Sequence, residues 1–264
     1  KNFPEEKILL ILEANYLYRK KDFKNSLQHL KKINFPDDLR NHSNYLVMYY
    51  DLLSKCLERR GDYKKAFRSM VKRNEIKKNL PENVKFEKKI VLNLIKDNKK
   101  YFVKKNIKKF SSNNEILNSK NLTFLVGFPR SGTTLLDTIL RTHSKIDVLE
   151  EKPFISNIRD NFFLSNNSQI NSLEKLSENS ILELQKEYYS YFDTSPNKII
   201  IDKFPLNIIE IGFIKKIFPK SKFILTLRHP CDVVLSCFST NFKINEAMAN
   251  FYDLENTTVL YNEV

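Results

Sequence analysis

The sequence predicts an α/β domain built on a parallel sheet, preceded by an all-α helical region. Three apolar segments, Leu122–Val126, Lys198–Lys203 and Lys222–Leu227, lack polar alternation, and each is followed by an apolar helical pattern. Strands of this kind are typical of a parallel sheet with both faces covered by helices. The chain before them shows helical periodicity only. We therefore expect helices over residues 1–110, an α/β domain over 118–264, and a polar joint between the two.

The helical region contains an internal repeat. Five residues of the first unit have counterparts forty positions later in the second unit. They are Leu17, Phe23, Ser26, Leu30 and Ile33, and their counterparts are Leu57, Tyr63, Ala66, Met70 and Arg73. Each unit predicts two short amphipathic helices, broken at Lys21-Asp22 or at Gly61-Asp62, that cross closely at the small residue. This pattern resembles the tetratricopeptide repeat, with a longer connection through Phe35–Asp38.

Composition and charge narrow the class of protein. The chain has 264 residues, 41% of them hydrophobic, and we find no apolar run of about eighteen residues and no signal peptide. Cys56, Cys231 and Cys237 are odd in number and lack metal-ligand spacing, so we expect free thiols in a reducing compartment, the cytoplasm. The sequence starts with Lys1 rather than Met, and we expect a piece of a longer protein as readily as a whole one.

The net charge of +14 lies almost entirely in the helical region. Residues 1–120 carry +16 and residues 121–264 carry −2, and +10 of the excess falls within residues 71–110. A solvated helix face and a surface for an acidic partner both stay open as explanations. We expect no nucleic-acid binding because no recognition motif or regular aromatic interleaving accompanies the lysines.

The segment from Leu122 to Leu136 predicts an anion-binding loop. A strand runs into a turn that carries Gly127, Pro129 and Gly132, and a helix follows at once. Unpaired amides and the helix dipole make such a helix N-terminus a site for phosphate-like groups. The spacing of Gly127 and Gly132 matches an ATP-type phosphate loop, but Thr133 stands where that motif needs Lys. The loop is therefore not suited to the β- and γ-phosphates of ATP.

The remaining strands and helices follow in regular order. We expect a helix over residues 132–142, a short strand over 146–149 ending in Glu150-Glu151, and a helix over 206–218 that Pro205 opens. Pro230 opens a further helix that runs to about Asn241. Ligands of parallel sheets bind at the carboxyl ends of the strands. Polar residues found just past such ends are Glu151, Lys203 and Arg228.

Four elements between Leu122 and Thr240 together resemble the sulfotransferases that use 3′-phosphoadenosine 5′-phosphosulfate (PAPS), most closely the tyrosylprotein-sulfotransferase-like branch. The elements are Pro129-Arg-Ser-Gly-Thr-Thr134, the pair Glu150-Glu151, the strand end Asp202-Lys203-x-Pro205, and Arg228 followed eight residues later by Ser236. Thr240 stands where that branch has a further Arg. The resemblance implies an in-line displacement that moves a sulfuryl group from PAPS to a hydroxyl, without a metal.

The resemblance also implies a role for each matching residue. The 5′-phosphosulfate would be gripped by Arg130, which also counts as catalytic, and by Ser131, Gly132, Thr133 and Thr134. Arg228 and Ser236 would bind the 3′-phosphate. Lys203 would stabilise the bridging oxygen, and Glu151 would serve as general base, with Glu150 open as the alternative.

Two other functions stay open. The segment Ile199–Asp202 also resembles the strand and Asp that hold Mg²⁺ in phosphate-loop NTPases, which suggests a nucleotide phosphotransferase. The other hypothesis is a repeat-based scaffold with an inactive sulfotransferase domain. For the enzyme we expect an acidic acceptor, either a peptide with a tyrosine or a glycan, bound near the basic helices. The sequence leaves the oligomeric state open.

Overall fold

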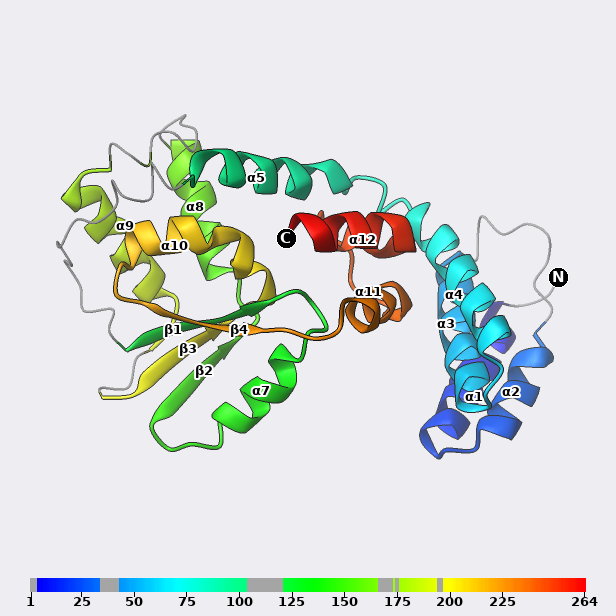
Figure 1. Ribbon diagram of the computed structural model, residues 1–264. Helices are drawn as coiled ribbons and strands as arrows, with labels where there is room; N and C mark the ends of the chain where they lie inside the picture. Colours follow the sequence, from blue (N-terminus) through cyan, green and yellow to red (C-terminus); the bar gives the residue numbers. More distant parts are fainter. Residues whose placement is uncertain (1–3, 34–42, 104–120, 166–172, 174–175, 194–196) are drawn as a thin grey trace. The chain divides into compact units, whose positions relative to one another are not determined.

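The computed structural model describes residues 4–33, 43–103, 121–165, 173, 176–193 and 197–264 (Figure 1). The chain forms two compact units, one of residues 1–91 with 234–260 and one of residues 92–233 with 261–264. The predicted polar joint at 111–120 and the connection Phe35–Asp38 lie outside the described residues. The predicted division into 1–110 and 118–264 therefore stays a prediction, and the two units are described one at a time.

The first unit begins with two helix pairs. The helices are α1 (Pro4–Arg19), α2 (Phe23–Lys31), α3 (Ser43–Arg59) and α4 (Tyr63–Lys78). The turns inside the two pairs are alike. Asp22 and Asp62 have nearly the same backbone angles, φ −87° and −86°, and each accepts a hydrogen bond from the N–H three residues later. Side-chain caps of this kind satisfy one of the amides that a helix start leaves unpaired.

The residue before each Asp has a left-handed backbone. Gly61 has φ 79° and Lys21 has φ 65°. Glycine takes this conformation freely, whereas other residues pay about 1–2 kcal/mol. The two pairs therefore share their turn geometry although only the second has a glycine in it. The assignment to the tetratricopeptide family stays a prediction.

Small residues stand where the helices of a pair meet. Ser26 and Ala66 are buried, and the Ser26 hydroxyl donates to the Ala14 carbonyl at 2.7 Å. Around them the hydrophobic cluster of this unit includes Ile11, Leu27, Leu30, Leu52, Cys56 and Leu57. Segments from the far end of the chain complete the unit, namely the end of α11 (Pro230–Ser239), the 3-10 helix η5 (Met248–Tyr252) and most of α12 (Leu254–Glu263).

The second unit contains a four-stranded parallel sheet, as the sequence predicts. Its strands are β1 (Leu122–Gly127), β2 (Ile146–Glu150), β3 (Ile199–Lys203) and β4 (Lys222–Thr226), in the order β2-β3-β1-β4. Leu125 pairs with Lys203, Lys203 pairs with Glu150, and Gly127 pairs with Thr226. This register brings the carboxyl ends of all four strands to one edge, where the predicted site residues lie.

Helices cover both faces of this sheet. α7 (Thr133–Leu140) lies on one side, and α8 (Phe154–Ser165), α9 (Glu178–Ser190) and α10 (Ile211–Ile217) lie on the other (Figure 1). α5 (Lys88–Tyr101) adds Tyr101 to the same core. The predicted single helix over 206–218 is wrong in its first half, because residues 205–210 form the 3-10 helix η4. There the Asn207 N–H bonds to the Phe204 carbonyl three residues back, which tightens the turn behind Pro205.

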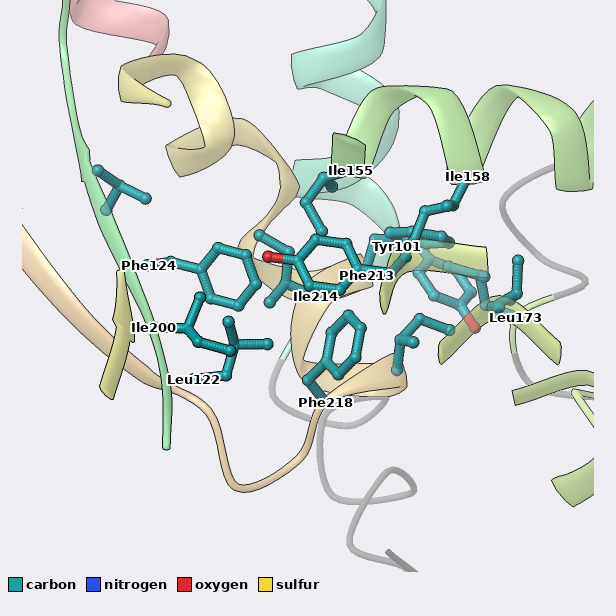
Figure 2. Packing of buried hydrophobic residues seen from close by; sticks show 14 residues of the cluster. Tyr101, Leu122, Phe124, Ile155, Ile158, Leu173, Ile200, Phe213, Ile214 and Phe218 are labelled. Atoms are coloured by element: carbon teal, nitrogen blue, oxygen red, sulfur yellow. The ribbon is translucent and has the colours of Figure 1, made fainter. Parts of the chain in front are cut away.

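Alternation along the strands separates a core face from a site face. Phe124 and Ile200 pack against Ile155, Phe213 and Phe218 of the covering helices (Figure 2). Leu125, one residue after Phe124, and Lys203, three residues after Ile200, point to the opposite face, since successive side chains of a strand alternate. No helix in the described part of the chain is long and apolar enough to cross a membrane.

Candidate active site

The predicted anion loop is present between β1 and α7. Gly132 adopts φ 105° at the N-cap of α7, and no side chain of the described residues caps this helix. The first hydrogen bond of the helix runs from the Leu136 N–H to the Gly132 carbonyl, so the amides before it are left for other partners. Arg130, which has φ 69°, is exposed on the same loop. The loop thus combines helix N-terminal amides with a guanidinium, a combination suited to an anion.

Gly127 allows this loop to pack tightly on the end of β4. A Cβ at Gly127 would lie 2.5 Å from Thr226 Oγ1 and 2.7 Å from Ser131 Oγ, closer than real Cβ atoms come. The two hydroxyls themselves are 2.7 Å apart and share a hydrogen bond. Thr226 therefore fixes the Ser131 side chain from the neighbouring strand. This contact could not be predicted from the sequence, because Thr226 stands there only as the end of an apolar strand.

Arg228 lies beside the same loop, two residues after β4. Its Nη1 donates to the Arg130 carbonyl at 3.4 Å, and its Nε lies 3.6 Å from Asp232 Oδ2. Both members of the pair with Asp232 are about half exposed, so the ion pair is weak. The guanidinium of Arg228 is accordingly available to an anion at the loop.

Lys203 occupies the centre of the strand ends. Its side chain is fully buried, yet its Nζ lies 2.7 Å from Glu151 Oε1, 3.4 Å from Glu150 Oε1 and 3.7 Å from Asp137 Oδ2. The Glu151 N–H also donates to the Lys203 carbonyl at 2.7 Å, which holds Glu151 against β3 with φ 48°. A buried ammonium needs such anionic partners to remain charged. The structure therefore brings together the Lys and the Glu pair that the sequence singled out.

Two residues of this network were missed from the sequence. Asp137 of α7 is buried, and Arg141 grips both of its carboxylate oxygens with contacts of 2.6–2.8 Å. Arg141 Nη2 also reaches Glu150 Oε2 at 2.9 Å. An Asp and an Arg four residues apart look like an ordinary surface pair on a helix, so nothing in the sequence pointed to Lys203.

The two glutamates differ in their surroundings. Glu150 uses one carboxylate oxygen toward Lys203 and the other toward Arg141, and the hydrogen bond from Arg141 lowers its pKa below the usual range. Glu151 contacts Lys203 through Oε1. Among the described residues nothing is bonded to its Oε2, and just over half of its side chain is exposed. Glu151 is therefore the carboxylate with an oxygen free to accept a proton.

Asp202 points away from this network, into the core. Its Oδ2 accepts a hydrogen bond from the Tyr188 hydroxyl at 2.8 Å, and no described group pairs with its Oδ1. Burial raises the pKa of Asp202 to about 7. A metal-binding Asp of a phosphate-loop NTPase would face the loop, whereas this carboxylate does not.

Ser236 belongs to the first unit and is described with it. It lies in the last turn of α11, which begins two residues after Arg228. Thr240, which replaces an Arg expected from the resemblance, caps this helix instead, since its hydroxyl donates to the Ser236 carbonyl at 2.6 Å. In the described ranges no group of three or more His, Cys, Asp or Glu side chains has the arrangement of a metal site.

A parallel sheet whose strand ends carry an anion loop, a buried Lys and a paired Glu has the arrangement of a site for an anionic ligand. The chain belongs to the sulfotransferase family, whose sequence profile matches residues 123–263, more than half of its length. The match begins at β1 and ends within α12, so it includes every site residue described above.

A protein of Aquifex aeolicus (strain VF5), named "Uncharacterized protein", is also similar. The two sequences are 30% identical over 214 residues, which cover 77% of this chain and 27% of the relative. The chain thus spans about a quarter of that relative's length. Since the similar stretch is longer than the 141 residues of the family match, it includes helices of the first unit.

Proposed function

We propose that this protein moves a sulfuryl group from PAPS to an acceptor hydroxyl, and that the acceptor is a tyrosine in an acidic peptide. The observation that carries the proposal is the ion pair of Lys203 and Glu151, whose Nζ and Oε1 atoms are 2.7 Å apart. Lys203 ends β3, which pairs with β1, and the anion loop follows β1. An ammonium and a carboxylate at this place are the two groups that such a transfer needs.

The loop residues fit the donor. The uncapped amides of α7 and the guanidinium of Arg130 suit the 5′-phosphosulfate, and Ser131 is held in place by Thr226. Arg228 beside the loop suits the 3′-phosphate that separates PAPS from ATP. Thr133 in place of the ATP-motif Lys agrees with this preference.

PAPS supplies the sulfuryl group, whose bond to the phosphate oxygen breaks as a bond to the acceptor oxygen forms. Lys203 would neutralise the negative charge that gathers on the leaving oxygen, a task that its burial makes more effective. Glu151 would take the hydroxyl proton on its Oε2. Glu150 is a poor base because Arg141 and Lys203 occupy both of its oxygens.

An acidic acceptor suits the exposed cations of α4. Lys64, Arg68 and Lys72 recur every four residues, so they form one stripe on this helix, and all three are exposed. Arg73 and Asn74 beside them are buried and bonded, so a test of the acceptor must leave those two intact. Reversing the three exposed charges should lower transfer to an acidic peptide while sparing a small phenol. We place the protein in the cytoplasm, where its three cysteines, none of which forms a disulfide in the described residues, would remain reduced.

Thermal unfolding with 3′,5′-adenosine bisphosphate, compared with ATP plus Mg²⁺, tests the donor. A bisphosphate concentration of a hundred times its Kd should raise the Tm by about 5 °C or more, and ATP should do much less. Arg130→Ala should abolish the shift, whereas Arg60→Ala, at an exposed arginine of the first unit, should keep it. A shift that requires ATP and Mg²⁺ would favour the phosphotransferase, which the burial of Asp202 in the core argues against. The scaffold hypothesis would be favoured if the wild type bound no donor and the Arg130→Ala variant still bound its partner.

A further inference from the structure

Arg73 of α4 makes five hydrogen bonds outside the candidate active site. It is fully buried, and its guanidinium donates to Asp51 Oδ1 at 2.8 Å, to Asn74 Oδ1 at 2.9 and 3.0 Å, and to two backbone carbonyls. The carbonyls belong to Phe238, at 3.0 Å, and Ser239, at 2.8 Å. All of these groups lie in the first unit.

These two carbonyls belong to the last turn of α11. A helix leaves its last four carbonyls without partners inside the helix, and here all four have a partner. The first two, of Ser236 and Cys237, accept from Thr240. Those of Phe238 and Ser239 accept from Arg73, and Asn74 Nδ2 adds a contact of 3.1 Å to Phe238.

The positive charge of Arg73 also has the right sign for its position. The C-terminal end of a helix carries about half a negative charge, which a cation there stabilises. Burial lowers the pKa of Arg73 somewhat, and the neighbouring Asp51 opposes that change, so the guanidinium stays charged. The ring of Phe67 packs on Phe238 at 5.3 Å between centroids and adds apolar support at the same turn.

The turn held in this way carries Ser236. Ser236 lies three residues before Ser239, which is less than one helical turn, so fixing the carbonyls at 238 and 239 holds the backbone of Ser236 and the direction of its Cα–Cβ bond. Helix ends otherwise fray, and a hydroxyl on a fraying turn is a poor phosphate ligand. Local bonds from Thr240 alone would leave the final two carbonyls to water.

We infer that Arg73 is a positioning residue for the nucleotide site: it clamps the end of α11 so that Ser236 is preorganised for the 3′-phosphate. This inference rests on the proposed function. The clamp comes from α4 of the helical repeat region, and the helix end that it holds lies in the same unit. A separable binding module would have no such contact.

The test measures the preference for 3′,5′-adenosine bisphosphate over adenosine 5′-monophosphate, as the ratio of the two Kd values. General loss of structure weakens both ligands, whereas a misplaced Ser236 weakens only the ligand with the 3′-phosphate. Ser236→Ala and Arg73→Gln should each lower the preference about tenfold, the size of one lost hydrogen bond to a charged group. Arg60→Gln, at an exposed arginine of the same unit that has no place in the proposed sites, is the control and should keep the wild-type preference.

The double variant Arg73→Gln with Ser236→Ala should show no lower preference than Ser236→Ala alone, because Arg73 acts through Ser236. Asn74→Ala removes the contacts of Asn74 to the Phe238 and Tyr252 carbonyls and its acceptor for Arg73, but it leaves both contacts of Arg73 to the end of α11 in place. It should therefore lower the preference less, and it decides the matter if Arg73→Gln does not fold. An unchanged preference in Asn74→Ala and Arg73→Gln, or additive losses in the double variant, would overturn the inference. A wild type that fails to bind the bisphosphate would instead overturn the proposed function.

Discussion

Arg73 and Lys203 are two fully buried cations with different kinds of partner. Arg73, in the first unit, is bound by one carboxylate, one side-chain amide and two backbone carbonyls. Lys203, in the second unit, is surrounded by three carboxylates and has no carbonyl partner among the described contacts. Carbonyls of a helix end are fixed in place, whereas carboxylate side chains can turn and can take up protons. In the roles proposed for them, Arg73 holds a helix end in position and Lys203 takes part in the chemistry, although both are fully buried.

The largest expected effect comes from removing the buried ammonium of the second unit. Lys203→Met should lower kcat by about a hundredfold or more, because charge on the leaving oxygen would lose its stabilising partner. Steady-state kinetics and bisphosphate binding measured together give the result. Lys198→Met, at a partly exposed pair with Asp147 just before the same strand, should change kcat by less than about twofold. Equal losses of kcat in the two variants would show that the buried position of Lys203 makes no difference to catalysis.

The carboxylate partners of Lys203 should separate in the same assay. Glu151→Gln removes the proposed base and should lower kcat by about a hundredfold, while Glu150→Gln should lower it by less than about tenfold. The rate of Glu150→Gln should also keep its dependence on pH, because the base is intact. A larger loss in Glu150→Gln would reverse the assignment and make the Arg141-bound carboxylate the base.

A buried carboxylate on the core face of β3 sharpens the contrast with Lys203. The pKa of Asp202 is raised from 3.8 to about 7, so the folded state favours its protonated form. This preference adds up to roughly 4 kcal/mol to the free energy of unfolding below about pH 4, and the contribution is lost as the pH rises through 7. Urea unfolding of Asp202→Asn at several pH values should lack this loss, whereas Asp97→Asn, at an exposed position, should retain it. The prediction would be contradicted if the free energy of unfolding changed between pH 5 and pH 8 by the same amount in the wild type and in Asp202→Asn.

The smallest effects test the two turns of the helix pairs in the first unit. Gly61→Ala should cost about 1 kcal/mol through its left-handed backbone alone, since a Cβ there meets no atom within 4 Å. Lys21→Gly should be neutral or stabilise by up to about 1 kcal/mol for the same reason. Urea midpoints of the two variants give the comparison. A Gly61→Ala variant as stable as the wild type would mean that the two turns are not equivalent.

Local pattern was sufficient for much of the second unit. Apolar runs without alternation predicted its parallel strands to within about one residue. The sequence also singled out Lys203 and Glu151 near strand ends, and the fold brings them into contact. Pro205 predicted the start of the next helix but not its 3-10 character, since that depends on how the turn packs.

Contacts that depend on distant backbone could not be predicted. The Phe238 and Ser239 carbonyls that bind Arg73 carry no side-chain signature, and they lie more than 160 residues away along the chain. Arg73 appeared in the sequence only as a repeat position equivalent to Ile33. Asp137 and Arg141 have the spacing of a common surface pair, so their link to Lys203 emerged only from the fold.

Transfer of label from PAPS radiolabelled at sulfur tests the central claim most directly. The wild-type protein, without added Mg²⁺, should move the label to an acidic tyrosine-containing peptide and release one 3′,5′-adenosine bisphosphate for each label transferred. The Lys203→Met variant should bind the bisphosphate and transfer about a hundredfold less label. Binding of the bisphosphate without transfer to any hydroxyl acceptor, or turnover of ATP that requires Mg²⁺, would contradict the account.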